Sequence, residues 1–142
     1  MGFSIKGNNV SVKIEVVCRP YSNAENIWDL NWLTCDISIK IPGYTANFNT
    51  YLTCSEIQSF FIELKQMHET LNGKASLSPL ESEIFIVAEI NKLGKVNWKI
   101  TTEYPVGTGN SLSFEFETDQ SYIYETLQDL KSTINEYPIL SV

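Results

Sequence analysis

Residues 32–52, WLTCDISIKIPGYTANFNTYL, decide the fold of this chain. Apolar side chains occupy every second position on both sides of Pro42-Gly43, which is the period of a strand with one buried face. Pro42-Gly43 fits the central pair of a type II turn, in which Gly43 supplies a positive φ. The segment therefore predicts an antiparallel hairpin with one apolar face and one polar face.

Further strand patterns lie on both sides of this hairpin. Apolar side chains alternate with polar ones in residues 10–18, 96–100 and 112–116, whereas residues 84–87 are apolar throughout. Arg19-Pro20 ends the first of these runs, because proline has no N–H to donate to a strand ladder. A polar loop is expected next, over residues 21–31. The chain is therefore predicted to contain about six antiparallel strands.

Two other segments have helical spacing. Residues 57–71 carry an apolar stripe that stops at an Asn-Gly pair. Thr53 and Glu56 before it have the spacing of a capping box, and Ser55 is an alternative N-cap. Residues 123–137 carry a second stripe, for which Asp119 is the predicted N-cap and the following proline the end. Both helices are expected to bury one face.

Together these elements predict the fold class. Strands followed by one helix occur twice, so the second half of the chain repeats the plan of the first. We expect an α+β fold in which an antiparallel sheet of about six strands has two amphipathic helices packed on one face. No linker-like stretch divides the chain, so one domain is expected over residues 1–142.

The composition excludes several classes of function. The chain has 142 residues, 43% of them hydrophobic, and a formal net charge of −7. Such an acidic chain repels phosphate backbones and anionic membranes, so neither nucleic-acid binding nor membrane binding is expected. No apolar run approaches the roughly 20 residues of a membrane-spanning helix, and no secretory signal is recognisable. Because an odd number of cysteines favours a reducing compartment, we expect a cytoplasmic protein.

The cysteines and the histidine form no recognisable catalytic or metal site. Cys18, Cys35 and Cys54 make no C-x-x-C pair, and the single His68 cannot complete a zinc site that needs two histidines. Cys54 and His68 are separated by roughly 20 Å along the predicted helix, which is too far for a catalytic pair. Cys18 and Cys35 share the parity of apolar strand faces and are predicted to be buried. We expect no metal and no cofactor.

Carboxylate pairs leave one alternative open. Glu115 and Glu117 are two residues apart on a predicted strand, so their side chains share a face. Beside Trp98 or Tyr51, such a pair could serve a small-ligand-binding or carboxylate-dependent hydrolytic domain. A solvated acidic face is the commoner origin of this pattern. The Gly107–Asn110 segment is expected to be a turn, because no lysine and no helix N-terminus follow it as in a phosphate loop.

The outward positions of the predicted strands suggest a protein-binding face. Opposite the apolar faces lie aromatic, amide and carboxylate side chains, a mixture that suits a protein partner. Trp32 stands out, because alternation places its indole among polar neighbours. A structural interpretation is equally open, in which Trp32 covers the end of the core or packs under the loop at 21–31. The residues selected as partner contacts are Trp32, Asp36, Tyr51, Glu115 and Glu117.

Three segments carry a resemblance to a known family. They are Trp28–Leu33 (WDLNWL), which leads into an alternating strand; Tyr51-Leu52 before the first helix; and Leu112–Ile123 (LSFEFETDQSYI), followed by a helix that ends at Tyr137-Pro138. In the order and spacing of these segments, over nearly its whole length, the chain resembles the WapI family of immunity proteins from bacterial polymorphic-toxin systems.

The resemblance implies a function by binding. It implies a small cytoplasmic protein, encoded beside a toxin gene, that binds the cognate toxin domain and blocks it without catalysis of its own. Several toxins of this class are nucleases, whose substrate sites are basic, and an acidic inhibitor suits such a target. Asp29 and Asn31 are good turn formers that can satisfy local backbone groups, so their motif is expected to be structural.

Overall fold

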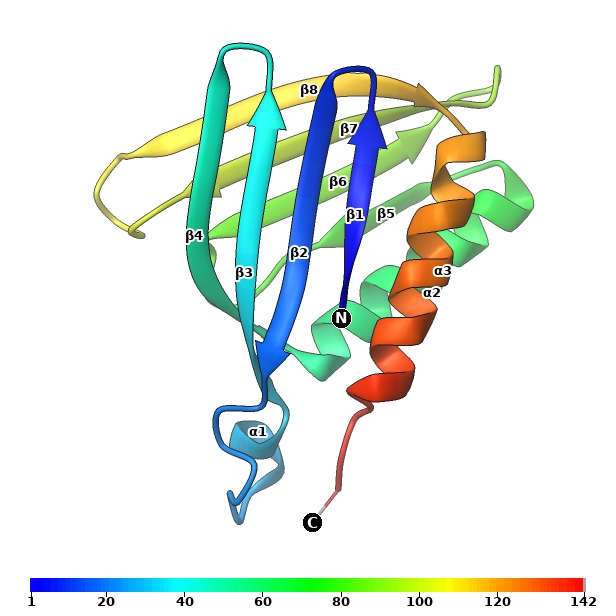
Figure 1. Ribbon diagram of the computed structural model, residues 1–142. Helices are drawn as coiled ribbons and strands as arrows, with labels where there is room; N and C mark the ends of the chain where they lie inside the picture. Colours follow the sequence, from blue (N-terminus) through cyan, green and yellow to red (C-terminus); the bar gives the residue numbers. More distant parts are fainter. Residues whose placement is uncertain (142) are drawn as a thin grey trace.

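The computed structural model describes residues 1–141 (Figure 1); Val142, the last residue of the predicted domain, lies outside the described residues. Each half of the chain contains four strands followed by a long helix, and the first half also contains a short helix. In chain order the elements are β1 (Gly2–Gly7), β2 (Val10–Cys18), α1 (Ile27–Leu30), β3 (Trp32–Ile41), β4 (Tyr44–Thr53), α2 (Cys54–Thr70), β5 (Lys74–Leu77), β6 (Ile84–Ile90), β7 (Lys95–Glu103), β8 (Ser111–Asp119) and α3 (Ser121–Glu136).

The strands form two antiparallel sheets. The first sheet has the order β1-β2-β3-β4 and the second has the order β5-β6-β7-β8, so each strand pairs with its neighbours in sequence. The sheets lie face to face and their strands cross steeply (Figure 1). Apolar side chains from both sheets, from α2 and from α3 meet in one core cluster, in which Trp98 is the largest fully buried side chain. The predicted α+β class is confirmed.

The predicted hairpin over residues 32–52 is confirmed as β3 and β4. Trp32 lies opposite Thr53 at one end, and Ile41 lies opposite Tyr44 across the turn. Gly43 has a φ of 81°, as a turn glycine with positive φ requires. The alternation predicts this hairpin correctly because each strand has ten residues, which repeat the apolar position often enough for the buried face to be recognised.

The prediction of one sheet with about six strands and two helices is wrong. The described chain has eight strands in two sheets, and α1 makes a third helix inside the predicted polar loop. The prediction missed β1 and β5, because each places only two side chains in the core. These are Phe3 and Ile5 in β1, and Ala75 and Leu77 in β5.

The long helices cover strand edges rather than one sheet face, which corrects the predicted packing. Helix α3 packs beside β1, where Thr126 Oγ1 donates to the Ser4 carbonyl (2.7 Å). Helix α2 packs beside β5, where Glu63 Oε1 accepts the Ser76 N–H (2.9 Å). Each helix therefore shields the first strand of the half to which it does not belong. The outer edges of β4 and β8 have no strand partner within residues 1–141.

The ends of the long helices agree only in part with the prediction. The capping box of α2 is confirmed: the Thr53 side chain accepts the Glu56 N–H, and the Glu56 side chain accepts the Thr53 N–H. Asp119 is not the N-cap of α3, because β8 extends to this residue; its carboxylate accepts the Ser121 N–H (3.1 Å) from one position before the cap. In the described chain, none of the helices has the length and hydrophobicity that crossing a bilayer requires.

The three cysteines occupy different environments. Cys35 is buried, and desolvation raises the pKa of its thiol to about 12, so the thiol stays protonated near neutral pH. Cys54 is buried at the start of α2. Cys18 is exposed, contrary to the prediction, because a register shift between Val16 and Cys18 breaks the alternation of β2.

Candidate functional site

The structure separates the predicted contact residues into two groups. Trp32, Asp36 and Tyr51 lie on β3 and β4 in the first sheet, whereas Glu115 and Glu117 lie on β8 in the second. All five point away from the core, which fills the space between the sheets. Because the outer faces of two stacked sheets point in opposite directions, the two groups do not form one surface.

Trp32 and Tyr51 meet at the end of the first sheet that adjoins α1. Their rings are arranged edge to face, with centroids 6.4 Å apart and an interplanar angle of 83°. Trp32 is half-buried and Tyr51 is 41% exposed, so each ring keeps a surface accessible to a partner. Asp36 lies on the same face farther along β3, opposite Asn49.

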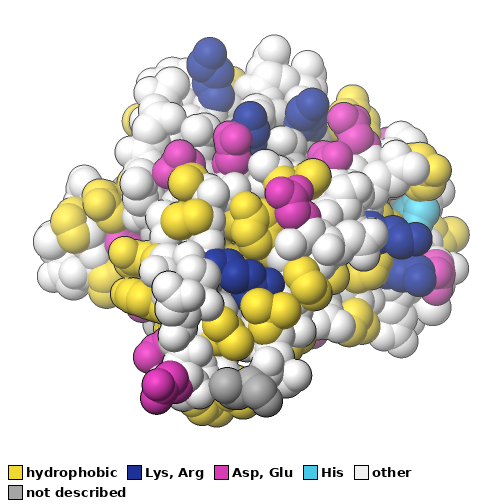
Figure 2. Space-filling view, turned by 60° about the horizontal axis from the view of Figure 1, so that its bottom comes forward, with side chains coloured by type: hydrophobic (Ala, Val, Ile, Leu, Met, Phe, Trp, Pro, Cys, Tyr) yellow, Lys and Arg dark blue, Asp and Glu magenta, His cyan; other side chains and the backbone are white. Residues whose placement is uncertain are grey.

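A groove of about 510 Å³ lies beside Trp32 and is mainly apolar. Its most exposed apolar residues are Trp28 and Leu80, each with 75% of its surface accessible to solvent. Figure 2 looks onto this end of the molecule, where hydrophobic side chains gather. The groove is lined by Ile27, Trp28, Asn31, Trp32, Thr53, Ser55, Glu56, Leu80 and Ile139. Exposed side chains of this size and grouping are typical of protein-binding surfaces.

A smaller groove of about 410 Å³ also borders Trp32. Three aromatic side chains and two carboxylates line it: Tyr21, Trp32, Tyr51, Asp29 and Glu81. Trp32 lines both grooves. No lysine, arginine or histidine is among the described residues that line either groove. We call the two grooves together the α1 surface.

Asparagine side chains shape the α1 surface. Asn26 caps α1: its Oδ1 accepts the Asp29 N–H (2.9 Å) and its Nδ2 donates to the Asp29 carboxylate (3.0 Å). Asn31 Nδ2 donates to the Ile27 carbonyl (2.7 Å), which closes the turn after α1. Asn31 therefore bonds the local backbone as expected of this motif, whereas the Asp29 carboxylate bonds the Asn26 side chain and no backbone group of the described residues.

Asn31 and Arg19 also hold the C-terminal segment against α1. Asn31 accepts the Leu140 N–H (2.8 Å) and donates to the Leu140 carbonyl (2.9 Å). Arg19 donates to the carbonyls of Leu30 (3.1 Å) and Pro138, and its guanidinium lies 5.9 Å from the ring centroid of Tyr137. These bonds place Ile139, between the two bonded residues, in the wall of the larger groove.

The loop between β5 and β6 supplies the opposite wall of the α1 surface. Glu56 Oε2 accepts the Leu80 N–H (2.8 Å), while its Oε1 serves the capping box. Thr50 Oγ1 donates to Glu83 (2.8 Å), which fixes the other end of the loop against β4. Leu80 and Glu81 are therefore held in place although both are exposed.

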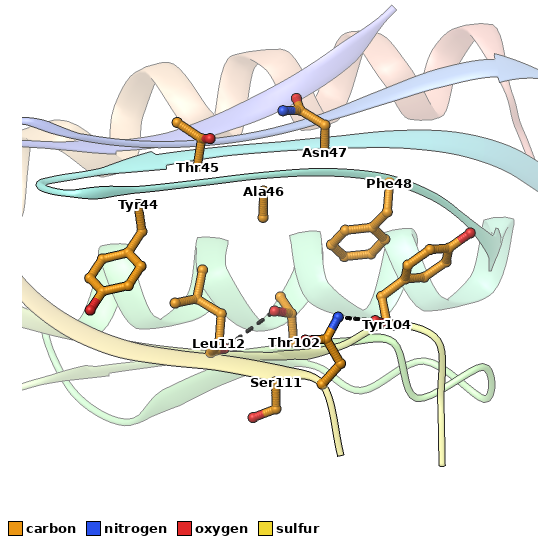
Figure 3. Close-up of a pocket in the computed structure, with 10 residues that line it drawn as sticks. Tyr44, Thr45, Ala46, Asn47, Phe48, Thr102, Tyr104, Ser111 and Leu112 are labelled. Carbon is orange, nitrogen blue, oxygen red and sulfur yellow. Dashed lines mark hydrogen bonds between the residues drawn. The ribbon is translucent and has the colours of Figure 1, made fainter. Parts of the chain in front are cut away.

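A third cavity, of about 350 Å³, opens between β4 and the β7–β8 connection. Tyr44, Ala46 and Phe48 point from β4 toward Thr102 and Leu112 of the second sheet (Figure 3). Phe48 stacks on the ring of Tyr104, with centroids 4.9 Å apart. Because these two rings already pack on each other and no charged side chain lines the cavity, it offers a partner less than the α1 surface does.

The immunity protein WapI-like family matches residues 3–138 of this chain. The chain belongs to that family. The resemblance drawn from the WDLNWL and LSFEFETDQSYI segments is therefore confirmed. The protein is an immunity protein, which acts by neutralising a toxin, and the family implies the role of a non-enzymatic inhibitor.

Among solved structures, this immunity protein is similar to a chain of the CdiA-CT/CdiI toxin and immunity complex from Enterobacter cloacae. The two chains are 12% identical and superpose with a TM-score of 0.45, over 84% of this chain and 97% of the other. A comparison with curated proteins finds no significant match.

The geometry does not favour the carboxylate alternative. Glu115 and Glu117 are exposed on the outer face of β8, whereas Trp98 is buried on the inner face of the same sheet. Tyr51 belongs to the other sheet. The two glutamates therefore lie away from both Trp98 and Tyr51, the aromatic residues that a hydrolytic or ligand-binding site would need beside them.

Sequence reasoning missed several residues of the α1 surface. Trp28 belongs to the WDLNWL segment, but the loop around it has no periodic pattern from which its exposure could be predicted. Leu80 and Ile139 lie in segments without regular structure, so nothing in the sequence of the immunity protein relates them to Trp32. Bonds from Glu56, Asn31 and Arg19 bring them there.

Proposed function

We propose that this immunity protein binds its cognate toxin domain through the α1 surface. One observation supports the proposal: large apolar side chains from three separate segments, among them Trp28, Leu80 and Ile139, are exposed together around Trp32. Hydrogen bonds already hold each segment in place, so binding would require little further ordering of these segments and little loss of their conformational entropy.

The charge around the α1 surface indicates the chemistry of the partner. The charged groups that line its grooves are the carboxylates of Asp29, Glu56 and Glu81. A basic toxin face would complement them and would be attracted by the net charge of −7. The basic substrate site of a nuclease has this character. We infer that the toxin is encoded beside the immunity gene, and that its inhibition occurs in the cytoplasm and requires no catalysis by the inhibitor.

Glu115 and Glu117 remain a separate prediction. They lie on the outer face of the second sheet and cannot share a flat interface with Trp32 and Tyr51. If the toxin approaches the α1 surface, these two residues act on it only through long-range attraction. Asp36, on the same face as Trp32, is proposed as a contact at the margin of the interface.

The test compares two exposed leucines. The toxin domain of the adjacent gene is co-expressed with the immunity protein carrying either Leu80→Asp or Leu93→Asp. Leu80 is 75% exposed in the α1 surface, and Leu93 is 85% exposed at the β6–β7 turn. We expect Leu80→Asp to weaken binding by at least about 2 kcal/mol, roughly thirtyfold, because a carboxylate would enter an apolar contact.

Leu93→Asp is the matched control and is expected to protect cells as well as the parent protein does. Affinity is measured by titration calorimetry with the purified toxin domain. Folding of both variants is checked by thermal melting, in which two exposed leucines should have similar small effects. Equal affinities for the two variants would exclude the α1 surface as the binding site.

A further inference from the structure

We infer that the smaller groove of the α1 surface receives an arginine side chain of the toxin, and that the larger groove receives an apolar side chain next to it. The inference rests on the proposed function and adds the chemistry of the residues that are recognised. Two observations support it: the two grooves have unlike linings, and the carboxylates of the smaller groove have oxygen lone pairs that accept no hydrogen bond from the described residues.

Trp32 borders two unlike grooves of the α1 surface. In the larger groove its neighbours include Ile27, Trp28, Leu80 and Ile139, which are apolar and at least 45% exposed. In the smaller groove its neighbours are two tyrosines and two carboxylates. A segment that fills both grooves is therefore expected to place an apolar side chain in the larger groove and a cation in the smaller one.

The smaller groove has the features that recognise a guanidinium. It is lined by three aromatic rings, those of Tyr21, Trp32 and Tyr51, which attract a planar cation. Asp29 and Glu81 supply oxygen acceptors. Arginine combines a planar charge with several N–H donors, so it can stack and pair at the same time. Lysine carries a compact, strongly hydrated charge and gains less from ring faces.

The carboxylates of the smaller groove have acceptor capacity to spare. Glu81 forms no ion pair or hydrogen bond with the described residues, and Asp29 accepts one side-chain bond from Asn26 and otherwise has free lone pairs. By contrast, both oxygens of Glu56 in the larger groove are engaged, by the Thr53 and Leu80 N–H groups. The cation is therefore expected at Asp29 and Glu81 and not at Glu56.

The protein's own arginine cannot occupy this position. Arg19 is the basic residue nearest to α1 in sequence, and its guanidinium is bound to the carbonyls of Leu30 and Pro138. It is not among the residues that line the smaller groove. The cation that matches Asp29 and Glu81 must come from a partner.

The first experiment uses the free immunity protein and a small probe. N-acetyl-L-arginine amide is titrated while the indole N–H signal of Trp32, assigned with the Trp32→Phe variant, is followed by NMR. N-acetyl-L-citrulline amide is the matched control, because it has nearly the same shape without the charge. N-acetyl-L-lysine amide tests a charge that is not planar. We expect a saturable shift with the arginine probe and at least tenfold weaker binding of the other two.

Two double variants locate the bound probe. Asp29→Asn with Glu81→Gln removes both charges of the smaller groove, and Glu115→Gln with Glu117→Gln removes two charges from the far face of the second sheet. The first pair is expected to weaken arginine binding at least tenfold, and the second is expected to leave it unchanged. Equal losses in both would show general attraction to an acidic protein and would overturn the inference, as would a lysine probe that binds equally well or an arginine probe that causes no shift.

The two proposals can fail separately. If Leu80→Asp weakens toxin binding but the arginine probe does not shift Trp32, the α1 surface binds the toxin and the arginine inference is wrong. If the probe binds but Leu80→Asp has no effect on the toxin, the groove takes arginine and the proposed function of the α1 surface is wrong. If both hold, the Asp29→Asn, Glu81→Gln variant should also bind the toxin at least tenfold more weakly.

Discussion

The β2–β3 connection and the β6–β7 connection occupy the same place in the two halves of the immunity protein, yet they differ in length and in the bonds that hold them. Residues 91–94 make a self-contained turn, in which Asn91 Oδ1 accepts the N–H groups of Leu93 (2.9 Å) and Lys95 (3.1 Å). Residues 19–31 instead contain α1 and are bonded to the C-terminal segment. A scaffold that tolerates the tight turn in one half can use the longer connection in the other for binding.

The comparison also shows where the core ends. The core cluster includes residues of both sheets and of both long helices, but none of residues 19–31. Most of the long connection therefore lies outside the main core cluster, although Leu30 is buried, and side-chain hydrogen bonds help to hold it in place. We therefore expect the two-sheet fold to tolerate changes in this connection better than changes in the core strands.

The largest loss of toxin affinity is expected when the long β2–β3 connection is replaced with the short β6–β7 turn. Replacing residues 19–31 with Asn-Lys-Leu-Gly, the sequence of residues 91–94, would delete α1, Arg19 and Asn31. We expect toxin binding to weaken by at least about 4 kcal/mol, roughly a thousandfold, because a whole cluster of contact residues is lost. Far-ultraviolet circular dichroism and calorimetry measure fold and affinity, and a variant that folds and still binds tightly would disprove the role of the connection.

A smaller loss of toxin affinity is expected when only the Asn31 side chain, which bonds the long connection to the C-terminal segment, is removed. Asn31→Ala deletes the bonds to Ile27 and Leu140, so the C-terminal segment and Ile139 lose their fixed position. We expect a loss of about 1–2 kcal/mol in affinity. The Leu140 amide should exchange its hydrogen much faster in the variant, since its acceptor is gone.

Thr70→Ala controls for the loss of a side-chain hydrogen bond elsewhere in the protein. Thr70 Oγ1 donates to the Gln66 carbonyl (2.8 Å) near the end of α2, away from the α1 surface. This variant should leave both affinity and Leu140 exchange unchanged. Slow Leu140 exchange in Asn31→Ala would show that another contact holds the C-terminal segment.

The smallest effect is expected on the far face of the second sheet. Glu115→Lys with Glu117→Lys reverses two charges of the acidic protein without touching the α1 surface. Because long-range attraction acts on encounter, we expect the association rate to fall by about tenfold or less at low salt, with little change in dissociation. Stopped-flow measurements at two salt concentrations test this. An increase in the dissociation rate would place these residues inside the interface.

Local pattern predicted the elements better than it predicted their assembly. The alternation in β3 and β4 and the Thr53/Glu56 capping box were correct, because both depend on residues close in sequence. The single sheet was wrong, because alternation indicates which side chains face a core but not which strands share a sheet. Cys18 was misplaced for a related reason: one register shift in β2 reverses the side to which the following residue points.

The candidate site was predicted only where it lies in regular strands. Trp32 and Tyr51 were selected from strand parity, and the structure confirms that both face outward at one end of the first sheet. Glu115 and Glu117 were selected by the same rule but lie on the other outer face. Parity is periodic along a strand, so it carries no information about which of two sheets a strand joins.

The sequence by itself determined the α+β class, the main hairpin, the capping of α2 and membership of the immunity protein family. Only the tertiary structure decided that helices shield β1 and β5, and that Trp28, Leu80 and Ile139 gather around Trp32. The physical reason is the range of the interactions. Strand alternation and helix caps arise from backbone geometry within a few residues, whereas the α1 surface depends on bonds such as Asn31–Leu140, which join segments 109 residues apart.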